Sequence, residues 1–344
     1  IFMTARKNVP AALELVFDAM HNSIMPQDEF DQFKKQMQVM IESMRDKPDA
    51  LAQNAITQHF NTYPKGDPRY EYSLDESLEQ LNKLTVDQVR AFYKEFGGTS
   101  RGEISIVGDF DPKAVEKIIR NDYAKYVSKA HYAPVVTEYR PVKATRVVID
   151  TPDKENAIIV ARSVFPINDT APDAPALTVA NWILGGGTGL SNRLIERLRQ
   201  KEGLSYGAGS HVRIPAKGDN GSFVFRAIVA PQNMLQAEAS ARDVIAKAIK
   251  DGFTDQEVEE AKKGLLQAMQ VARSQDDVVA RSWNDKMENQ RTWAFSKKQA
   301  EAISKLTTAD VNAALRKYIK PDEITFVLAG DQKKAAFDCR LLRF

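Results

Sequence analysis

The sequence predicts an α+β fold with two related domains, each a largely antiparallel sheet with helices packed on one face. Two observations predict it. Part of the chain recurs later in the same order, and the second copy reads as apolar strands, a run of helices and a closing strand. Strands grouped apart from helices are typical of α+β units. We expect residues 1–130 to form the C-terminal part of a first domain that is truncated at its N-terminus, 131–142 a linker, and 143–344 a complete second domain.

The strongest match within the repeat joins residues 83–89 (KLTVDQV) to residues 305–311 (KLTTADV). At the same offset, an apolar stretch ending in Gly108-Asp109 recurs as one ending in Gly330-Asp331. An earlier match joins Glu29 and Lys34-Lys35 to Glu257 and Lys262-Lys263. Matches in one order indicate internal duplication. The second copy has a long stretch before its matching helices and the first has almost none, so we expect the chain to begin inside a domain.

In the first copy, apolar residues recur at helical spacing. They predict helices over 9–23, 26–44 and 48–60. Residues 61–74 are rich in Pro, Gly and Asp and predict a loop. Thr85, with Gln88 three positions later, predicts a capping box at the start of a further helix. A strand over 103–110 and a helix over 112–126 are expected to complete this copy.

In the second copy, apolar runs predict the strands of a sheet. These strands are expected over 146–150, 157–165, 204–214, 221–229 and 323–329. Helices are predicted over 172–184 and 231–250. Thr254 and Glu257 are expected to cap the next helix, with Phe253 packed onto Val258.

Composition excludes several classes of protein. Of the 344 residues, 43% are hydrophobic and 27% are charged, as in ordinary globular proteins. The net charge is +2 with both signs interspersed, and no apolar run is long enough to span a bilayer, so we expect no nucleic-acid partner and no membrane insertion. The single cysteine, Cys339, excludes an internal disulfide and a cysteine-based zinc site. No leader is visible in this chain, which starts at Ile1.

The stretch 185–212 (GGGTGLSNRLIERLRQKEGLSYGAGSHV) is the most informative part of the sequence. A glycine run precedes an amphipathic helix that carries Arg193, Arg197 and Arg199, stops near Gly203 and is followed by a strand. Arg199 and Tyr206 lie seven positions apart. From the residues alone, an arginine near a helix C-terminus and a tyrosine in a strand both have ordinary structural explanations.

This stretch resembles the pitrilysin/insulysin family of zinc metallopeptidases, the inverzincins, and the resemblance extends over nearly the whole chain. In the C-terminal half of that family, an arginine and a tyrosine at this spacing contact substrate at the zinc of the other half. The resemblance implies that Arg199 holds a substrate carbonyl and that Tyr206 donates a hydrogen bond to the oxyanion. Gly185, Gly186 and Gly187 would form a loop of the substrate chamber.

The zinc motif of the family, H-x-x-E-H on a helix, is absent from the sequence. The histidines, which we interpret as surface or hydrogen-bonded residues, are His21, His59, His131 and His211. The family's further acidic positions fall on Phe33 and Met40, which cannot bind metal, although Glu42 is only two residues beyond. The resemblance therefore implies no metal in this chain and a zinc ion on the complementary half.

Three other patterns have weaker chemical interpretations. Residues 203–207 fit G-x-S-x-G of serine hydrolases, but that motif needs the order strand, turn and helix, which is reversed here. The run Gly185–Gly189 fits no dinucleotide or P-loop pattern, so close packing is favoured over anion binding. Residues 281–295 are expected to be a solvated helix face with Trp283 and Trp293 turned inward, and a docking surface is the alternative.

The leading functional prediction is the C-terminal, non-catalytic half of a zinc metalloendopeptidase. Its partners would be a peptide or unfolded polypeptide substrate and a complementary H-x-x-E-H half, in the same polypeptide or in a partner subunit. The rival prediction is a structural or binding subunit of the same fold, like the core subunits of respiratory cytochrome bc complexes. A periplasmic location is expected from bacterial relatives of this layout.

Overall fold

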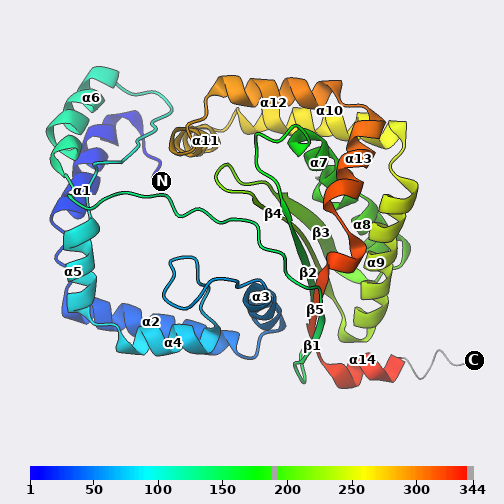
Figure 1. Ribbon diagram of the computed structural model, residues 1–344. Helices are drawn as coiled ribbons and strands as arrows, with labels where there is room; N and C mark the ends of the chain where they lie inside the picture. The colour runs from blue at the N-terminus through cyan, green and yellow to red at the C-terminus, as the bar shows by residue number, and fades with distance from the viewer. Residues whose placement is uncertain (188–191, 339–344) are drawn as a thin grey trace, which may run out of the picture. The chain divides into compact units, whose positions relative to one another are not determined.

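The computed structural model describes residues 1–187 and 192–338 (Figure 1). The chain divides into two compact units, each discontinuous in sequence. The first comprises Ile1–Met40, Glu76–Pro134 and Met269–Ser296, and the second comprises Ile41–Asp75, Val135–Ala268 and Lys297–Phe344. These bounds differ from the expected division at 131–142, because residues 41–75 join the second unit and residues 269–296 join the first.

The α-helices of the described residues are α1 (Val9–His21), α2 (Gln27–Met44), α3 (Pro48–His59), α4 (Leu74–Lys83), α5 (Val86–Phe96), α6 (Pro112–Asn121), α7 (Ala174–Asn181), α8 (Arg193–Ile195), α9 (Met234–Asp251), α10 (Asp255–Ala272), α11 (Asp276–Glu288), α12 (Trp293–Lys305), α13 (Thr308–Tyr318) and α14 (Gln332–Asp338). The π-helical turns are η3 (Trp182–Gly186) and η4 (Glu196–Lys201). The strands are β1 (Arg146–Asp150), β2 (Ala157–Pro166), β3 (Ser205–Arg213), β4 (Asn220–Val229) and β5 (Thr325–Gly330). Among the described helices, none has the length and apolar character that a membrane span requires.

The second unit is built on a five-stranded sheet with the strand order β1-β5-β2-β4-β3. The β1–β5 pair is parallel and the other neighbours are antiparallel. The longest ladder joins β2 to β4, from Ala157 opposite Val229 to Pro166 opposite Asn220. The α+β class and the five strands predicted in the second copy are therefore confirmed, with small shifts at the strand ends.

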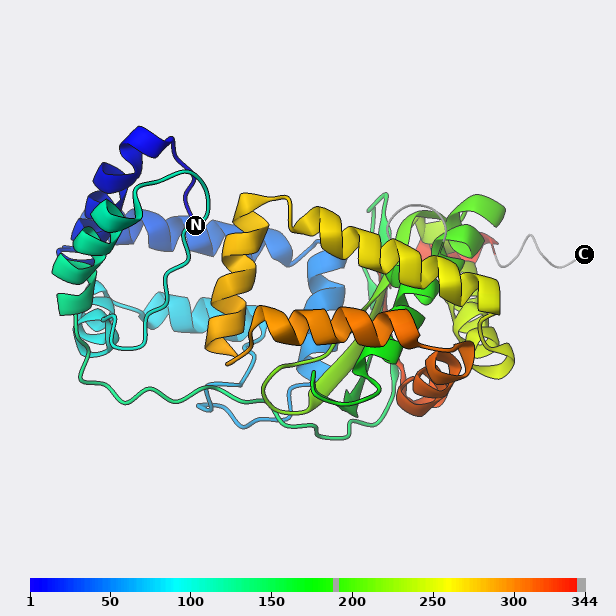
Figure 2. The same ribbon diagram turned by 90° about the horizontal axis from the view of Figure 1, so that it is seen from above.

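Helices cover both faces of this sheet, with α7 and α9 on one face and α3 on the other (Figures 1 and 2). Ala52 and Ile56 of α3 are fully buried and pack against one set of strand residues. That set is Ile158, Val160, Val327 and Ala329. We expected helices on one face only. The difference arises because the apolar side of α3, which lies in the first copy, is buried on the sheet of the second.

The core of the first unit is small and lies between α1, α6 and the segment before α6. Leu13, Phe17 and Val115 are buried there, and Ile104 and Ile106 pack against them. The predicted strand over 103–110 is wrong, because this segment has no regular secondary structure. A strand needs a hydrogen-bonded neighbour, and no described residue of the first unit belongs to a strand.

The other predicted helices of the first copy are confirmed, with shorter ends, as α1, α2, α3 and α6. The capping box at the start of α5 is also confirmed, since Thr85 and Gln88 bond each other's backbone amides. The matching helix α13 of the second copy begins with the same arrangement, made by Thr307 and Asp310. Helix α4 was not predicted, and it begins at Leu74, where the expected loop ends.

A pair of lysines makes the duplication visible in the structure. In the first copy, the Lys34 Nζ donates a hydrogen bond to the carbonyl oxygen of Leu84 at 2.8 Å. In the second copy, the Lys262 Nζ donates to the carbonyl oxygen of Leu306 at 2.9 Å. Both lysines and both leucines are matched positions of the repeat. The same contact therefore holds the start of the capped helix in each copy.

Replacing Lys262 with methionine tests how much this contact contributes. Lys262→Met keeps the apolar stem in place but leaves the Leu306 carbonyl without its donor, so we expect the free energy of unfolding to fall by about 1–2 kcal/mol. Urea unfolding would measure it, with Lys263→Met at the adjacent exposed position as the control. Equal stability of the two variants would contradict a structural role for the Lys262 contact.

Candidate functional site

The segment after the glycine run forms a short helix of mixed type. The Asn192 side chain is buried and caps it by accepting a hydrogen bond from the Ile195 amide at 2.9 Å. Helix α8 then continues directly into the π-helical turn η4. Leu194 and Leu198 are fully buried and anchor the two parts to the second unit. The π-helical turn alters the spacing of the outward residues, and such turns are frequent at functional sites.

Gly203 ends this helix in a left-handed conformation, with φ of +63°. The Leu204 amide beyond it donates to the carbonyl oxygen of Leu198 at 2.8 Å. A Cβ at Gly203 would meet nothing within 4 Å, so glycine is needed here for its backbone angle and not for space. The chain then enters β3, as predicted.

Arg193, the first arginine of the helix, is in a bidentate ion pair. Its Nε and one terminal nitrogen donate to the Glu257 carboxylate at 2.7 and 2.8 Å, and its guanidinium lies over the ring of Phe253. Burial alone would raise the pKa of Glu257. The hydrogen bonds from Arg193 and from the Thr254 backbone outweigh burial, and the pKa lies below its usual value.

The two later arginines differ from each other. Arg197 pairs with Glu202 and lies 3.6 Å from the Asp243 carboxylate. Arg199 is exposed, and it makes no hydrogen bond or ion pair with the residues that the structure describes. Structural pairing therefore explains Arg193 and Arg197 and leaves Arg199 without such an explanation.

Tyr206 lies at a β-bulge near the start of β3. Ser205 stands opposite Val229 and Gly207 opposite Ile228, so Tyr206 is the extra residue. The Ser205 hydroxyl clamps the bulge, with its oxygen 2.7 Å from the Gly207 carbonyl oxygen, 2.9 Å from that of Ile228, and 3.1 Å from the Gly207 amide nitrogen. The Tyr206 side chain is 65% exposed. Bulges of this kind redirect a side chain and are common beside active sites.

Gly185 and Gly186 lie in the π-helical turn η3 and not in the loop that we expected, while Gly187 directly follows it. A Cβ at Gly185 would lie 2.6 Å from the Ser210 Oγ, and one at Gly186 would lie 2.3 Å from the Asn181 Nδ2. The buried Asn181 and Ser210 side chains are themselves hydrogen-bonded at 2.8 Å. The first two glycines therefore permit close packing of η3 on β3.

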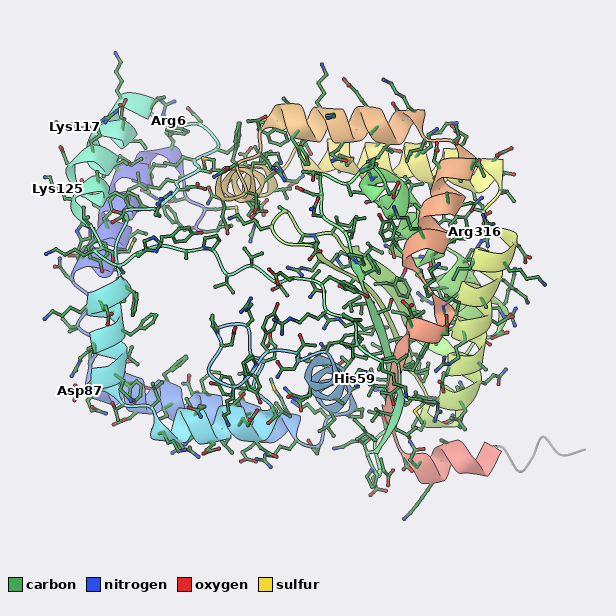
Figure 3. All side chains as sticks on the ribbon, viewed as in Figure 1. Arg6, His59, Asp87, Lys117, Lys125 and Arg316 are labelled. Atoms are coloured by element: carbon green, nitrogen blue, oxygen red, sulfur yellow. The ribbon has the colours of Figure 1, made fainter. Side chains whose placement is uncertain are left out.

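The described residues contain no group of three or more His, Cys, Asp or Glu side chains that could hold a metal ion. Phe33 and Met40, at the expected ligand positions, are exposed apolar side chains of α2. Glu42 forms an ion pair with Arg45. The side chains at the expected ligand positions thus do not fit a zinc site. His59 lies at the end of α3 (Figure 3), where its Nε2 is 2.9 Å from the Lys143 carbonyl oxygen.

The remaining sequence predictions have mixed outcomes. The rings of Trp283 and Trp293 lie 5.6 Å apart, edge to face, and both are partly buried. Thr188, Gly189 and Cys339 lie outside the described residues. Sequence reasoning missed two structural features, the Asn192 cap and the Ser205 clamp. Isolated glycines within a strand pattern indicate a β-bulge. Gly207 and Gly209, which lie in the predicted strand, could therefore have indicated the bulge that Ser205 holds.

A family description, the peptidase M16 inactive domain, matches residues 83–265, which is more than half of the chain. The chain therefore belongs to the peptidase M16 family and contains its inactive domain. This confirms the predicted family and the prediction that this chain is the non-catalytic part. Zinc protease and non-peptidase names both occur among its relatives.

Curated relatives are longer than this chain. A "non-peptidase homolog YmxG" of Helicobacter pylori is 21% identical over 256 residues, which cover 74% of this chain and 58% of the relative. An uncharacterised zinc protease of Streptomyces coelicolor is 24% identical over 277 residues, covering 78% of this chain and 58% of the relative. The chain thus spans less than two thirds of the length of these relatives.

Solved structures share the fold. A peptidase M16 inactive domain from Pseudomonas fluorescens has a TM-score of 0.82 at 22% identity, covering 95% of this chain and 76% of that one. A protease from Helicobacter pylori has a TM-score of 0.78 at 19% identity, covering 95% and 77%. A chain of Complex III2 from Candida albicans has a TM-score of 0.70 at 13% identity, covering 96% and 79%.

The contrast between Arg193 and Arg199 predicts that replacing Arg193 destabilises the fold and that replacing Arg199 does not. Arg193→Met should lower the free energy of unfolding by about 1–3 kcal/mol, because it leaves the partly buried Glu257 carboxylate without its bidentate donor. Arg199→Met, on the same helix, should leave it unchanged. Urea unfolding of both variants would measure the difference, and equal losses would contradict the assignment.

The same pair predicts a pH dependence. The folded pKa of Glu257 is depressed, so its ion pair stabilises the fold above the unfolded pKa. This stability is lost as the pH falls through the folded pKa. Arg193→Met should therefore flatten the decline of stability at pH values below the ordinary pKa of a glutamate side chain. Urea unfolding at a series of pH values would measure this. If stability falls with pH as steeply in Arg193→Met as in the wild type, the ion pair does not cause the decline.

The bulge clamp can be tested by Ser205→Ala. The buried hydroxyl accepts a hydrogen bond from one amide and has two carbonyl oxygens within reach of its single proton, so its removal should cost about 1–2 kcal/mol of unfolding free energy. Ser274→Ala, at an exposed hydroxyl bonded within its own turn, is the control. Thermal unfolding would compare the two, and a neutral Ser205→Ala would mean that the bulge is held by the backbone alone.

Proposed function

We propose that this chain is the C-terminal half of a zinc metalloendopeptidase, and that it completes the peptide-binding chamber and presents Arg199 and Tyr206 to the substrate. The observation that supports this most is the contrast among the three helix arginines. Two are held by carboxylates, while Arg199 is exposed and unpaired among the described residues. A nearby bulge releases Tyr206 from the β3–β4 ladder.

In this proposal the zinc ion, the base and the attacking water belong to a complementary H-x-x-E-H half. That half would be part of the same longer polypeptide or a partner subunit. The greater length of the curated relatives and their zinc protease names support this arrangement. So does the residue content of this chain, since the positions expected to bind metal are Phe33 and Met40.

The chemistry of the two side chains suits peptide cleavage. An arginine fork can hold a backbone carbonyl of an extended peptide through charge-assisted hydrogen bonds. A tyrosine hydroxyl can donate to the oxyanion that forms when hydroxide attacks the scissile carbonyl. The substrate would be a short peptide or an unfolded polypeptide, because both groups act on the backbone. We further propose a periplasmic location for the whole protein.

A structural or binding role is the second candidate. It is favoured by the name of the Helicobacter pylori relative, a non-peptidase homolog, and by the fold shared with a chain of Complex III2. A scaffold would not need an exposed, unpaired arginine and a bulged tyrosine seven positions apart. These two residues therefore discriminate between the candidates.

The test is peptidase activity on a quenched, unstructured peptide with added Zn²⁺. This chain alone should be inactive, and its mixture with the complementary H-x-x-E-H half, or the full-length protein, should be active. Tyr206→Phe should lower kcat about 100-fold, as loss of one oxyanion donor does. Arg199→Ala should mainly raise KM, by about tenfold or more, because it removes charge-assisted hydrogen bonds to the bound peptide.

Arg197→Ala serves as the matched control, because that arginine is already paired. Wild-type activity in Arg199→Ala and Tyr206→Phe would exclude their proposed roles. Inactivity of the complete protein on every unstructured peptide would favour the scaffold. Activity of this chain alone would show that it binds a metal after all.

A further inference from the structure

A row of basic side chains crosses the face of the sheet that α3 covers. Arg162 of β2 stands opposite Val224 of β4, which stands opposite His211 of β3. Directly opposed residues in antiparallel strands point to the same face. Arg213 lies two residues further along β3 and so shares that face. His211 and Arg213 are exposed, while Arg162 is mostly buried.

No described carboxylate is hydrogen-bonded to Arg162 or forms an ion pair with it. Its guanidinium lies over the ring of Phe60, 4.8 Å from the centroid. Its Nε is buried without a hydrogen-bond partner. Its two terminal nitrogens are not among the buried atoms, and they make no hydrogen bond or ion pair with described residues. A cation that loses part of its hydration is normally paired, because burial without a partner costs desolvation free energy.

The surroundings do not offset this cost. Burial, and then the positive charge of Arg213, lower the pKa of Arg162, while the Glu71 carboxylate acts in the opposite direction without reaching hydrogen-bond distance. The guanidinium nevertheless stays charged at neutral pH. The C-terminal end of α3, which precedes Phe60, contributes only the partial negative charge of a helix end.

A neighbouring arginine provides the contrast. Arg226 of β4 points to the same face, opposite Val160 and Gly209. Asp49 at the start of α3 neutralises it, with hydrogen bonds of 2.7 and 3.2 Å. A carboxylate therefore pairs with Arg226, whereas no described carboxylate is hydrogen-bonded to Arg162, His211 or Arg213.

We propose that Arg162, His211 and Arg213 form a subsite for a carboxylate of the bound peptide, either an acidic side chain or the C-terminus. That the carboxylate belongs to a peptide rests on the proposed function. That these three side chains bind a carboxylate does not depend on it. The carboxylate would complete the pairing of the buried Arg162, and bidentate recognition by a guanidinium is the geometry that a carboxylate fits.

The position of the subsite predicts how far the carboxylate lies from the cleaved bond of the peptide. His211 and Arg213 follow Tyr206 on β3 by five and seven residues, about 17–23 Å at the rise of an extended strand. An extended peptide that runs beside β3 with its scissile bond at Tyr206 would place its carboxylate about five to seven residues away. The chain would therefore favour peptides that carry a negative charge at that distance from the cleaved bond.

The test is direct binding of peptides, without any proteolysis. Three unstructured peptides of about twelve residues, carrying an uncharged fluorophore at the N-terminus, share one sequence. The first has a glutamate near the C-terminus and an amidated end, the second has glutamine and a free carboxylate end, and the third has glutamine and an amide. Fluorescence anisotropy should show the first or the second binding at least about tenfold more tightly than the third.

Variants then assign the effect to the subsite. Arg162→Gln and Arg213→Gln should each remove most of the preference, whereas Arg226→Gln, which deletes the same charge at a neutralised position, should keep it. Arg162→Met should also raise the Tm of the free chain, since it removes a partly buried charge that forms no ion pair with described residues. A residue that merely supported the fold would lower the Tm instead.

Equal binding of the three peptides, no binding of any of them, or an unchanged preference in Arg162→Gln and Arg213→Gln would each overturn the proposal. A preference for the first peptide alone identifies an acidic side chain as the ligand, and a preference for the second alone identifies the C-terminus. Because Arg199 and Tyr206 are intact in every variant, failure of this subsite is distinguishable from failure of the proposed function.

Discussion

The unbroken ladder between β2 and β4 is the constraint on which both proposed sites depend. It joins the middle of the sheet to β3, and its register decides which side chains share a face. Ile158 and Val160 point to the face that α3 covers, and their burial fixes that register. A slip of one residue would remove both from the contact with α3 and would turn Arg162 to the opposite face. Apolar packing under α3 therefore determines where the unpaired charge lies.

Charge compensation separates structural arginines from functional candidates in this fold. Arginines held by carboxylates include Arg193, Arg197 and Arg226. The arginines that no described carboxylate holds, and that the two proposals use, are Arg162, Arg199 and Arg213. Exposure alone would not separate the two groups, since Arg226 is exposed and Arg162 is mostly buried. What distinguishes them is whether the fold provides a counter-charge, and unpaired cations are available to a ligand.

The sequence was sufficient to predict the strands of the second copy, because a long apolar run such as 157–165 usually forms a buried strand. It also predicted the capping box of Thr85, which depends on side chains three positions apart. The segment 103–110 has a similar pattern and was mispredicted, since strand formation depends on a neighbour that local pattern does not reveal. The pairing of Arg193 with Glu257 joins residues far apart in the chain. For that reason spacing alone could not show which of the helix arginines would stay free.

The bulge at Tyr206 connects the two proposed sites. Before the bulge, Ser205 stands opposite Val229, and after it His211 stands opposite Val224, so the register of β3 shifts by one residue between them. Without the extra residue, Ser210 would stand opposite Val224 and would lose its buried hydrogen bond to Asn181. His211 would then point away from Arg162. One inserted residue thus frees Tyr206 from the ladder, keeps Ser210 in the buried interface with η3, and turns His211 toward the unpaired guanidinium.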